Sequence, residues 1–266
     1  MTTSRGERAA NYVVLVAFAV FALAPIAVVL VTALSPSTTS PGGLSVFVQA
    51  WSEGSFSRYM LTSATVAIVV VSIAVLASML AGYALGTMDT RGGSVIFALF
   101  LLGLMVPAEA IVVPLFYDMR ALGLTNTLWA VALPQIAQSI AFGTYWMRAY
   151  FRSAPRPVME AARLDGAGSW RTLWSVLVPI GRPAVVTLVL LVFMWTWNEF
   201  LIPLVMSPNG DFRTAPLALA IFKGQHVQAT GLLAAAAVLV ALPVVVLYLF
   251  LQRHFIRGMV EGAIRE

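Results

Sequence analysis

The 266-residue chain is 60% hydrophobic, only 10% charged, and carries a net charge of +5. Its mean hydropathy of +0.90 and its apolar runs of about 20 residues are typical of a polytopic membrane protein, because no soluble core needs such long apolar stretches. The absence of cysteine excludes disulfides and thiol catalysis, and two histidines make a histidine-based metal site a poor interpretation.

Six apolar segments are long enough to cross a bilayer, and they are continuous rather than alternating, which favours helices over a barrel. The first segment follows two arginines, as a signal peptide does, but it is longer than the usual signal core of about 7–15 residues, so we expect a retained helix. The predicted class is all-α, a polytopic membrane protein of six transmembrane helices. The predicted spans are 12–34, 61–85, 95–119, 128–147, 184–206 and 230–251.

Arginine and lysine placement predicts the orientation of the bundle. With a cytoplasmic N-terminus, the inside segments hold most of the arginines, whereas the outside segments hold only Arg58, Arg120, Arg213 and Lys223. Basic residues favour the cytoplasmic side, so both termini and the loop 148–183 are expected there. The positive net charge is therefore explained by the membrane topology, and it does not indicate binding to nucleic acid.

This cytoplasmic loop is predicted to form two short helices joined by a glycine. The first runs over about 157–165, and Gly166 supplies the left-handed residue that ends it. Ser169 is expected to cap the second helix, 170–177, which should stop before Pro179 because the residue before proline avoids the α region.

The first of these helices has two different faces. Arg156, Glu160 and Arg163 fall at i, i+4 and i+7, a spacing that allows ion pairs along one stripe. Small side chains on the other face allow close approach to a groove on another protein, although an ordinary solvated loop is the alternative. These small-face residues are Val158, Ala161, Ala162 and Asp165.

The order of residues in the loop resembles a known motif. The pattern Glu-Ala-Ala-x-x-Asp-Gly-Ala at 160–167, followed by Pro179, is similar to the EAA loop of permease subunits in binding-protein-dependent ABC importers. Segments at 107–115, 197–204 and 252–258 resemble the second permease of carbohydrate importers of the maltose-transporter type. The resemblance implies a type I permease fold and assigns ATPase coupling to Glu160, Ala161, Ala162, Asp165, Gly166, Ala167 and Pro179.

Partners and location follow from this resemblance. It implies a second, non-identical permease, a dimer of cytoplasmic ATP-binding subunits that holds ATP and Mg, and an extracytoplasmic sugar-binding protein that contacts the outer loop 207–229. The single lysine, Lys223, lies outside, so the chain has no phosphate-binding loop of its own. We therefore expect a multi-pass protein of the bacterial cytoplasmic membrane, surrounded by lipid, with no catalytic residue, metal or cofactor.

Three regions are expected along the chain. Residues 1–57 hold the N-terminus, the first span and an outer loop, 58–252 form the permease core, and 253–266 form a cytoplasmic tail. The resemblance covers about 12–262.

Polar residues inside the spans are candidates for a substrate path. Glu109 and Glu199 fall at a similar depth, where a charge is costly, and Asn198 and Trp197 or Trp195 are suited to sugar hydroxyls and to the flat face of a pyranose. Alternatively, the carboxylates bind backbone groups of broken helices, and the tryptophans belong to the interfacial belt. A weaker pair in the fourth span, for which interhelical hydrogen bonds are expected, is Gln135 and Gln138.

Two rival functions are weighed against an ATP-driven sugar importer. A proton-coupled secondary transporter would use Glu109 and Glu199 as proton sites, but no inverted repeat is apparent in the two halves. A membrane enzyme or scaffold is the other rival, and the sequence shows no convergent nucleophile, base or metal groups.

Overall fold

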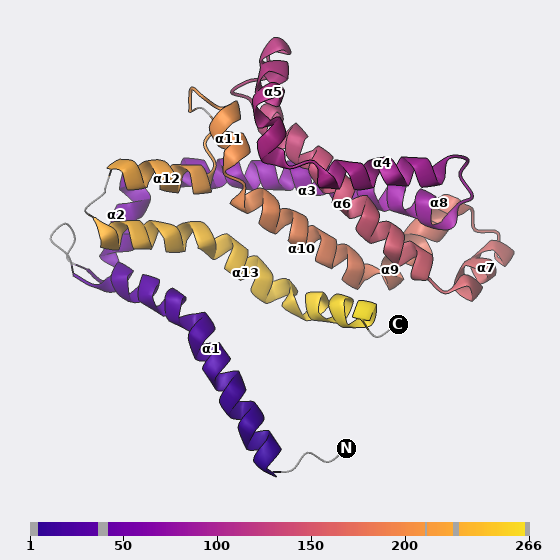
Figure 1. Ribbon diagram of the computed structural model, residues 1–266, viewed down its shortest axis with the longest axis horizontal. Helices are drawn as coiled ribbons and strands as arrows, with labels where there is room; N and C mark the ends of the chain where they lie inside the picture. Colours follow the sequence, from indigo (N-terminus) through magenta and orange to yellow (C-terminus); the bar gives the residue numbers. More distant parts are fainter. Residues whose placement is uncertain (1–4, 37–41, 211, 226–228, 264–266) are drawn as a thin grey trace. The chain divides into compact units, whose positions relative to one another are not determined.

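The computed structural model describes residues 5–36, 42–210, 212–225 and 229–263, and every regular element in these ranges is a helix (Figure 1). The predicted all-α class is therefore confirmed. By its contacts the chain divides into two units, Met1–Ser57 with Ala218–Leu242, and Arg58–Leu217 with Pro243–Glu266.

The first unit contains α1 (Arg5–Leu34), α2 (Ser45–Glu53), and parts of α12 (Ala215–Gln225) and α13 (Thr230–Ala263). Its aromatic contact is between Phe56 and Phe222, whose ring centroids lie 5.8 Å apart in an edge-to-face arrangement. The most apolar window of α1 has no residue buried within the chain. This window of α1 is suited to contact with lipid or with another protein.

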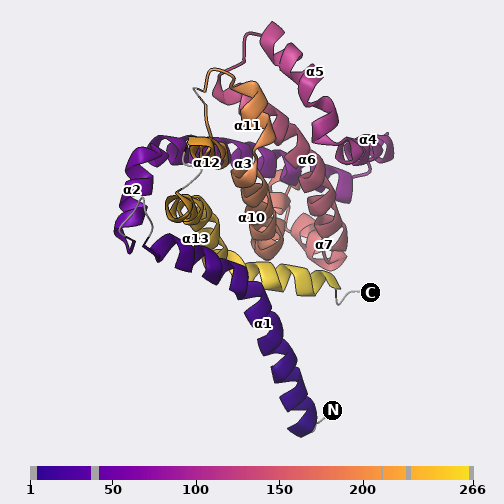
Figure 2. The same ribbon diagram turned by 60° about the vertical axis from the view of Figure 1, so that its left-hand side comes forward.

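The second unit is organised around α6 (Leu128–Ser153). This helix contacts α4, α10 and α11, and Figures 1 and 2 both show it running beside α10. Its buried face carries Met147 and Phe151, which pack in the main core with Tyr83, Leu173 and Leu188. Other helices of the unit include α3 (Phe56–Thr87), α4 (Gly93–Met105), α5 (Ala108–Ala121), α10 (Arg182–Asn198) and α11 (Leu201–Met206).

Glycines allow α3 and α6 to cross at close range. A Cβ atom at Gly82 would lie 2.8 Å from the backbone nitrogen of Arg148, and one at Gly86 would lie 3.2 Å from the carbonyl oxygen of Arg148. Two small residues four positions apart let helix backbones approach each other inside a membrane, where van der Waals packing drives association. The α3–α6 crossing therefore depends on having no side chain at these positions.

Arg148 connects three helices near the predicted cytoplasmic end of α6. Its Nε donates to the carbonyl oxygen of Leu85 at 3.1 Å, and its guanidinium lies 3.8 Å from the ring centroid of Phe97. The first contact satisfies a carbonyl in the last turn of α3, which has no partner within its own helix. The second is a cation–π contact with α4.

Proline breaks two of the predicted spans. The span 95–119 is two helices, α4 and α5, bent by 98° at Val106 and Pro107, and Figure 2 shows α5 turning away from α4. Val106 is extended, as expected for a residue that precedes proline. Hydropathy located this apolar stretch but did not place the break, because it does not register the lost backbone hydrogen bond.

The span 184–206 is also interrupted. Helix α10 ends at Asn198, Glu199 is extended with ψ 125°, and α11 begins at Leu201. Pro203 explains the position of this break, because proline in a helix clashes with the carbonyl group four residues earlier, here that of Glu199. The ranges 201–206 and 184–198 are thus separate helices.

Three single helices within the described residues are long and apolar enough to cross a membrane, and they match the first, second and last predicted spans. The number rises to five if two sharply bent helix pairs each count as one span, namely Gly93–Met105 with Ala108–Ala121 and Ser169–Ile180 with Arg182–Asn198. The fourth predicted span corresponds to α6, which is 26 residues long and ends in a basic turn.

We expect Gly82→Ala to destabilise the α3–α6 crossing, because the new methyl group would press against the backbone of α6. Overpacking of this kind costs about 1–3 kcal/mol. Thermal unfolding of the purified protein in detergent would measure the loss. Gly103→Ala is the matched control, since a Cβ atom there lies 3.8 Å from the Cβ of Ala141, an ordinary contact. Equal unfolding temperatures for the two variants would contradict the prediction.

Candidate functional site

The first helix of the 148–183 loop, α7 (Arg156–Leu164), ends in a Schellman motif. Gly166 has φ +75°, its N–H donates to Arg163 at 3.0 Å, and the N–H of Ala167 donates to Ala162 at 2.9 Å. Asp165 is the C-cap residue between them. The Asp-Gly-Ala part of the motif therefore has a structural reason, because glycine adopts the left-handed conformation without strain. The prediction for Gly166 is confirmed.

The second helical segment differs from its prediction. Helix α8 (Ser169–Thr172) begins at Ser169 itself, and its N-cap is Gly168, with no side-chain capping bond. The helix then passes through Pro179 by way of a π-helical turn at Leu173–Leu177 and α9 (Val178–Ile180). A π turn widens the helix and shifts its hydrogen bonds, which accommodates the missing N–H of proline. The expected Ser169 cap and the stop before Pro179 were both wrong.

Long-range contacts fix this second segment, and the start of α10 after it, to α6. The hydroxyl group of Tyr150 donates to the carbonyl of Leu177 at 2.9 Å, and Nε1 of Trp146 donates to the carbonyl of Ala184 at 3.0 Å. Leu173 and Leu177 are each only 1% exposed and belong to the main core. The segment therefore forms one packed body with α6.

Helix α7, by contrast, presents most of its surface to solvent. Glu160, Arg156 and Arg163 are all exposed, and within the described residues no ion pair joins Glu160 to either arginine. The pairing expected along this stripe is absent, since exposed pairs gain little energy for ordering two long side chains. Of the motif residues, Ala162 is buried and Ala161 is exposed.

Two exposed apolar side chains in this loop were not singled out from the sequence. Leu164 is 89% exposed and Trp170 is 66% exposed, on either side of the glycine turn. Trp170 contacts Trp174 edge to face, with centroids 5.7 Å apart. An isolated leucine at the end of a charged helix was the available signal. Exposed apolar groups of this size mark interaction surfaces when they stand beside polar ones.

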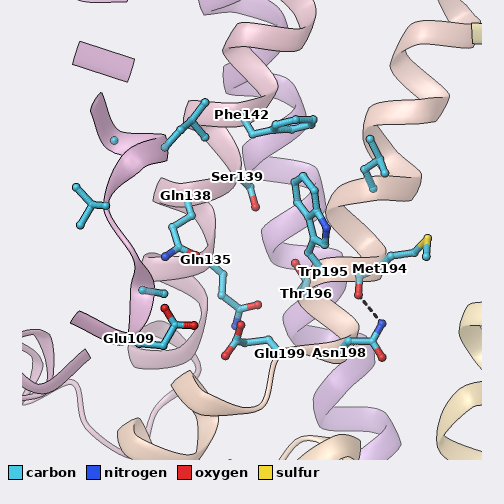
Figure 3. Close-up of a pocket in the computed structure, with 15 residues that line it drawn as sticks. Glu109, Gln135, Gln138, Ser139, Phe142, Met194, Trp195, Thr196, Asn198 and Glu199 are labelled. Carbon is cyan, nitrogen blue, oxygen red and sulfur yellow. Dashed lines mark hydrogen bonds between the residues drawn. The ribbon is translucent and has the colours of Figure 1, made fainter. Parts of the chain in front are cut away.

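A cavity of about 550 Å³ lies where the two spans are broken (Figure 3). Its volume is within the range of about 300–1,000 Å³ that small-molecule sites occupy. The lining comes from α4, α5, α6 and α10 and from the break after α10. Its polar members are Glu109, Gln135, Gln138, Ser139, Thr196, Asn198 and Glu199.

Glu199 stabilises the helix break directly. Its Oε1 accepts a hydrogen bond from the backbone N–H of Ile202 at 2.9 Å, in the first turn of α11. Such N–H groups have no partner inside their helix. Glu109 occupies the first turn of α5, where a negative charge is favourable to the helix dipole. Both carboxylates therefore follow a break, which agrees with the backbone-binding interpretation for Glu199.

The remaining path candidates divide into two groups. Asn198 lines the cavity, and its Nδ2 donates to Met194 at 2.8 Å within α10. Trp195 also lines it and contacts Phe142 edge to face at 4.7 Å. Trp197 is only 4% exposed, stacks against Phe193, and is not among the lining residues. The structure thus brings Glu109, Asn198 and Glu199 together and leaves Trp197 apart.

Two further predictions concern other parts of the chain. In the outer loop 207–229, residues 211 and 226–228 lie outside the described residues. Within the described part, no group of three or more acidic or histidine side chains is arranged to hold a metal ion.

Comparisons with known proteins agree on one family. Residues 78–261 match the family described as "Binding-protein-dependent transport system inner membrane component". The chain is 34% identical over 231 residues to the arabinooligosaccharides transport system permease protein AraQ of Halalkalibacterium halodurans, covering 86% of this chain and 81% of that one. It is 33% identical over 212 residues to the trehalose transport system permease protein SugB of Mycobacterium tuberculosis, covering 79% and 77%.

The fold is similar to that of a solved transporter. The crystal structure of a bacterial ABC transporter involved in the import of the acidic polysaccharide alginate contains a chain that matches with a TM-score of 0.73. The match covers 96% of this chain and 99% of the other, at 24% identity. It supports the fold rather than the cargo.

Replacing Glu199 by alanine should loosen α11, because the N–H of Ile202 loses its acceptor. A capping bond contributes about 1 kcal/mol, which corresponds to a roughly fivefold change in an opening equilibrium. Hydrogen–deuterium exchange of the 201–206 peptide would measure the change. Asn198→Ala serves as the control, since its amide bonds within α10. Unaltered exchange in Glu199→Ala would show that the cap is unimportant.

Proposed function

Because the chain belongs to the family of binding-protein-dependent transport system inner membrane components, we propose that it is a transmembrane subunit of an ATP-driven sugar importer. The family assignment confirms the resemblance found in the sequence. The protein is therefore a multi-pass inner-membrane component and a transport subunit rather than an enzyme. Transport proceeds by alternating access, in which the bundle opens first to the outside and then to the cytoplasm.

The proposed assembly contains this chain, a second and non-identical permease, two ATP-binding subunits and an extracytoplasmic binding protein. Relatives named as arabinooligosaccharide and trehalose permeases support a carbohydrate cargo. ATP and Mg belong to the ATP-binding subunits in this proposal. Both termini and the 148–183 loop face the cytoplasm, and 58–252 form the transport core between the peripheral regions 1–57 and 253–266.

Coupling to the ATPase is assigned to α7 and the turn that follows it. The observation that carries this assignment is an exposed helix held on a packed support: Glu160 and Leu164 are exposed, whereas Tyr150 fixes the adjoining segment to α6. A helix supported in this way transmits a displacement to the bundle instead of bending. The proposed coupling residues are Glu160, Ala161, Ala162, Asp165, Gly166, Ala167 and Pro179.

The substrate path is assigned to the cavity at the helix breaks. Glu109, Asn198 and Glu199 line it, and of the two tryptophans named from the sequence, Trp195 and Trp197, it is Trp195 that offers an aromatic face to the cavity. Half-exposed Trp195 is available to a pyranose ring, while buried Trp197 acts in packing. Cargo therefore passes between α4, α6 and α10 of this chain and the facing surface of the second permease.

We expect Glu160→Ala and Gly166→Val to lower transport and weaken capture of the ATP-binding subunit while leaving membrane insertion intact. The first removes an exposed carboxylate from the docking face. The second places a β-branched residue at φ +75°, where it is strained, and so disrupts the Schellman motif. Affinity capture of the ATP-binding subunit and uptake of labelled sugar would both be measured.

A matched control for the loss of charge is Asp89→Ala. Asp89 is an exposed carboxylate in the turn between α3 and α4, on the same predicted side of the membrane. Its variant should capture the ATPase normally. Wild-type uptake and normally stimulated ATP hydrolysis in both coupling variants would refute the assignment.

The energy source can be tested separately. Uptake should persist in membranes whose proton gradient is collapsed while ATP is retained, and it should stop when ATP is depleted. The opposite result would favour the rival, a proton-coupled secondary transporter that uses Glu109 and Glu199.

A further inference from the structure

The two ends of the cavity differ in chemical character. Figure 3 shows Glu109, Gln135 and Glu199 gathered toward one end, whereas Phe142 and Trp195 lie toward the other. The two aromatic rings are in edge-to-face contact, with centroids 4.7 Å apart, and form an apolar wall. A lining with an aromatic wall and a few convergent polar groups suits a ring that has an apolar face and polar edges.

Gln135 supplies a buried acceptor that the protein itself leaves without a donor. Gln135 is only 5% exposed, and its Nε2 donates to the carbonyl of Val131 at 2.9 Å. Its Oε1 has no hydrogen-bond partner among the described residues. A buried oxygen in this state is costly, so it favours an occupant that carries an O–H or N–H group.

The two carboxylates add acceptors of the same kind. One oxygen of Glu199 is engaged by the N–H of Ile202, which leaves the other for the cavity. Glu109 makes no side-chain hydrogen bond within the described part of the chain, so both of its oxygens are available. An ionised carboxylate accepts hydrogen bonds and donates none. The start of α5, which would otherwise favour an anionic ligand, already has Glu109 in its first turn.

Resting on the transport function proposed above, we infer that this cavity takes neutral or amino-bearing saccharides and rejects anionic ones, such as uronate or sulfonate sugars. Its lining residues, all within the described part, include two acids and no lysine, arginine or histidine. An anionic group beside Glu109 or Glu199 is repelled, and the repulsion is stronger in a membrane-embedded cavity than in water. Hydroxyl and ammonium donors instead satisfy Oε1 of Gln135 and the free carboxylate oxygens.

The test measures binding to the purified transporter, assembled with its partner permease and ATP-binding subunits. The binding protein is left out, because it would impose a selection of its own. Saturation-transfer NMR detects weak binding from an equimolar mixture of trehalose, a glucosamine disaccharide and a glucuronate disaccharide. We expect the first two to give about tenfold stronger signals than the glucuronate sugar.

Variants locate the effect in this cavity. Glu109→Gln, alone and with Glu199→Gln, should raise the ratio of glucuronate binding to trehalose binding about tenfold, because the amide keeps an acceptor oxygen and removes the charge. Gln135→Met should lower trehalose binding about fivefold, since it removes the buried acceptor. Asp118→Asn is the control, because Asp118 lies on α5 but does not line the cavity.

Equal binding of all three sugars by the wild type would overturn the inference. So would an unchanged glucuronate signal in the Glu109 variants, or the absence of any saccharide signal. Capture of the ATP-binding subunit and ATP-dependent uptake test the transport function independently. If both persist while binding ignores charge, the selectivity alone is refuted.

Discussion

The lost hydrogen bond of proline is the constraint on which the functional part of this structure depends. Pro107 and Pro203 cannot continue the backbone ladder of their helices, so each of these spans is divided into two helices. The free N–H groups at such a restart need acceptors inside the membrane, and Glu199 supplies one. Each break thus creates a need for a polar group, and that group becomes part of the cavity wall. Glu199 consequently both caps α11 and lines the cavity.

Sequence patterns predicted the helices well and their interruptions poorly. Hydropathy identifies long apolar segments because it sums composition, but it treats a broken span and a straight one alike. Proline alone does not resolve the matter, since Pro134 lies inside the continuous helix α6, whereas Pro107 marks a bend of 98°. Whether a proline breaks a helix depends on the neighbours that can satisfy the freed carbonyl, and those neighbours come from tertiary structure.

Some features of the candidate site could likewise be predicted from the sequence, and others could not. The left-handed conformation of Gly166 was predictable, because it depends on a local rule about one residue and its neighbours. The hydrogen bonds from Tyr150 and Trp146 were not predictable, because they join residues far apart in the sequence. Tyr150 bonds to a residue 27 positions away, and Trp146 to one 38 positions away. Similar depth suggested that Glu109 and Glu199 belong together, and both line the cavity. Distinguishing Trp195 from Trp197 required the rotation of α10, which a uniformly apolar helix does not reveal.

The contacts that hold the 148–183 loop and the start of α10 against α6 share a property that bears on how such proteins diversify. Tyr150 and Trp146 both donate to main-chain carbonyl oxygens, and the turn after α7 is closed by main-chain bonds and one glycine. Bonds to the backbone survive changes of side chain at their acceptor positions. The exposed residues of α7 are therefore free to vary without disturbing the support beneath them. A surface organised in this way can adapt to a changed partner through single substitutions, while the membrane bundle keeps its packing.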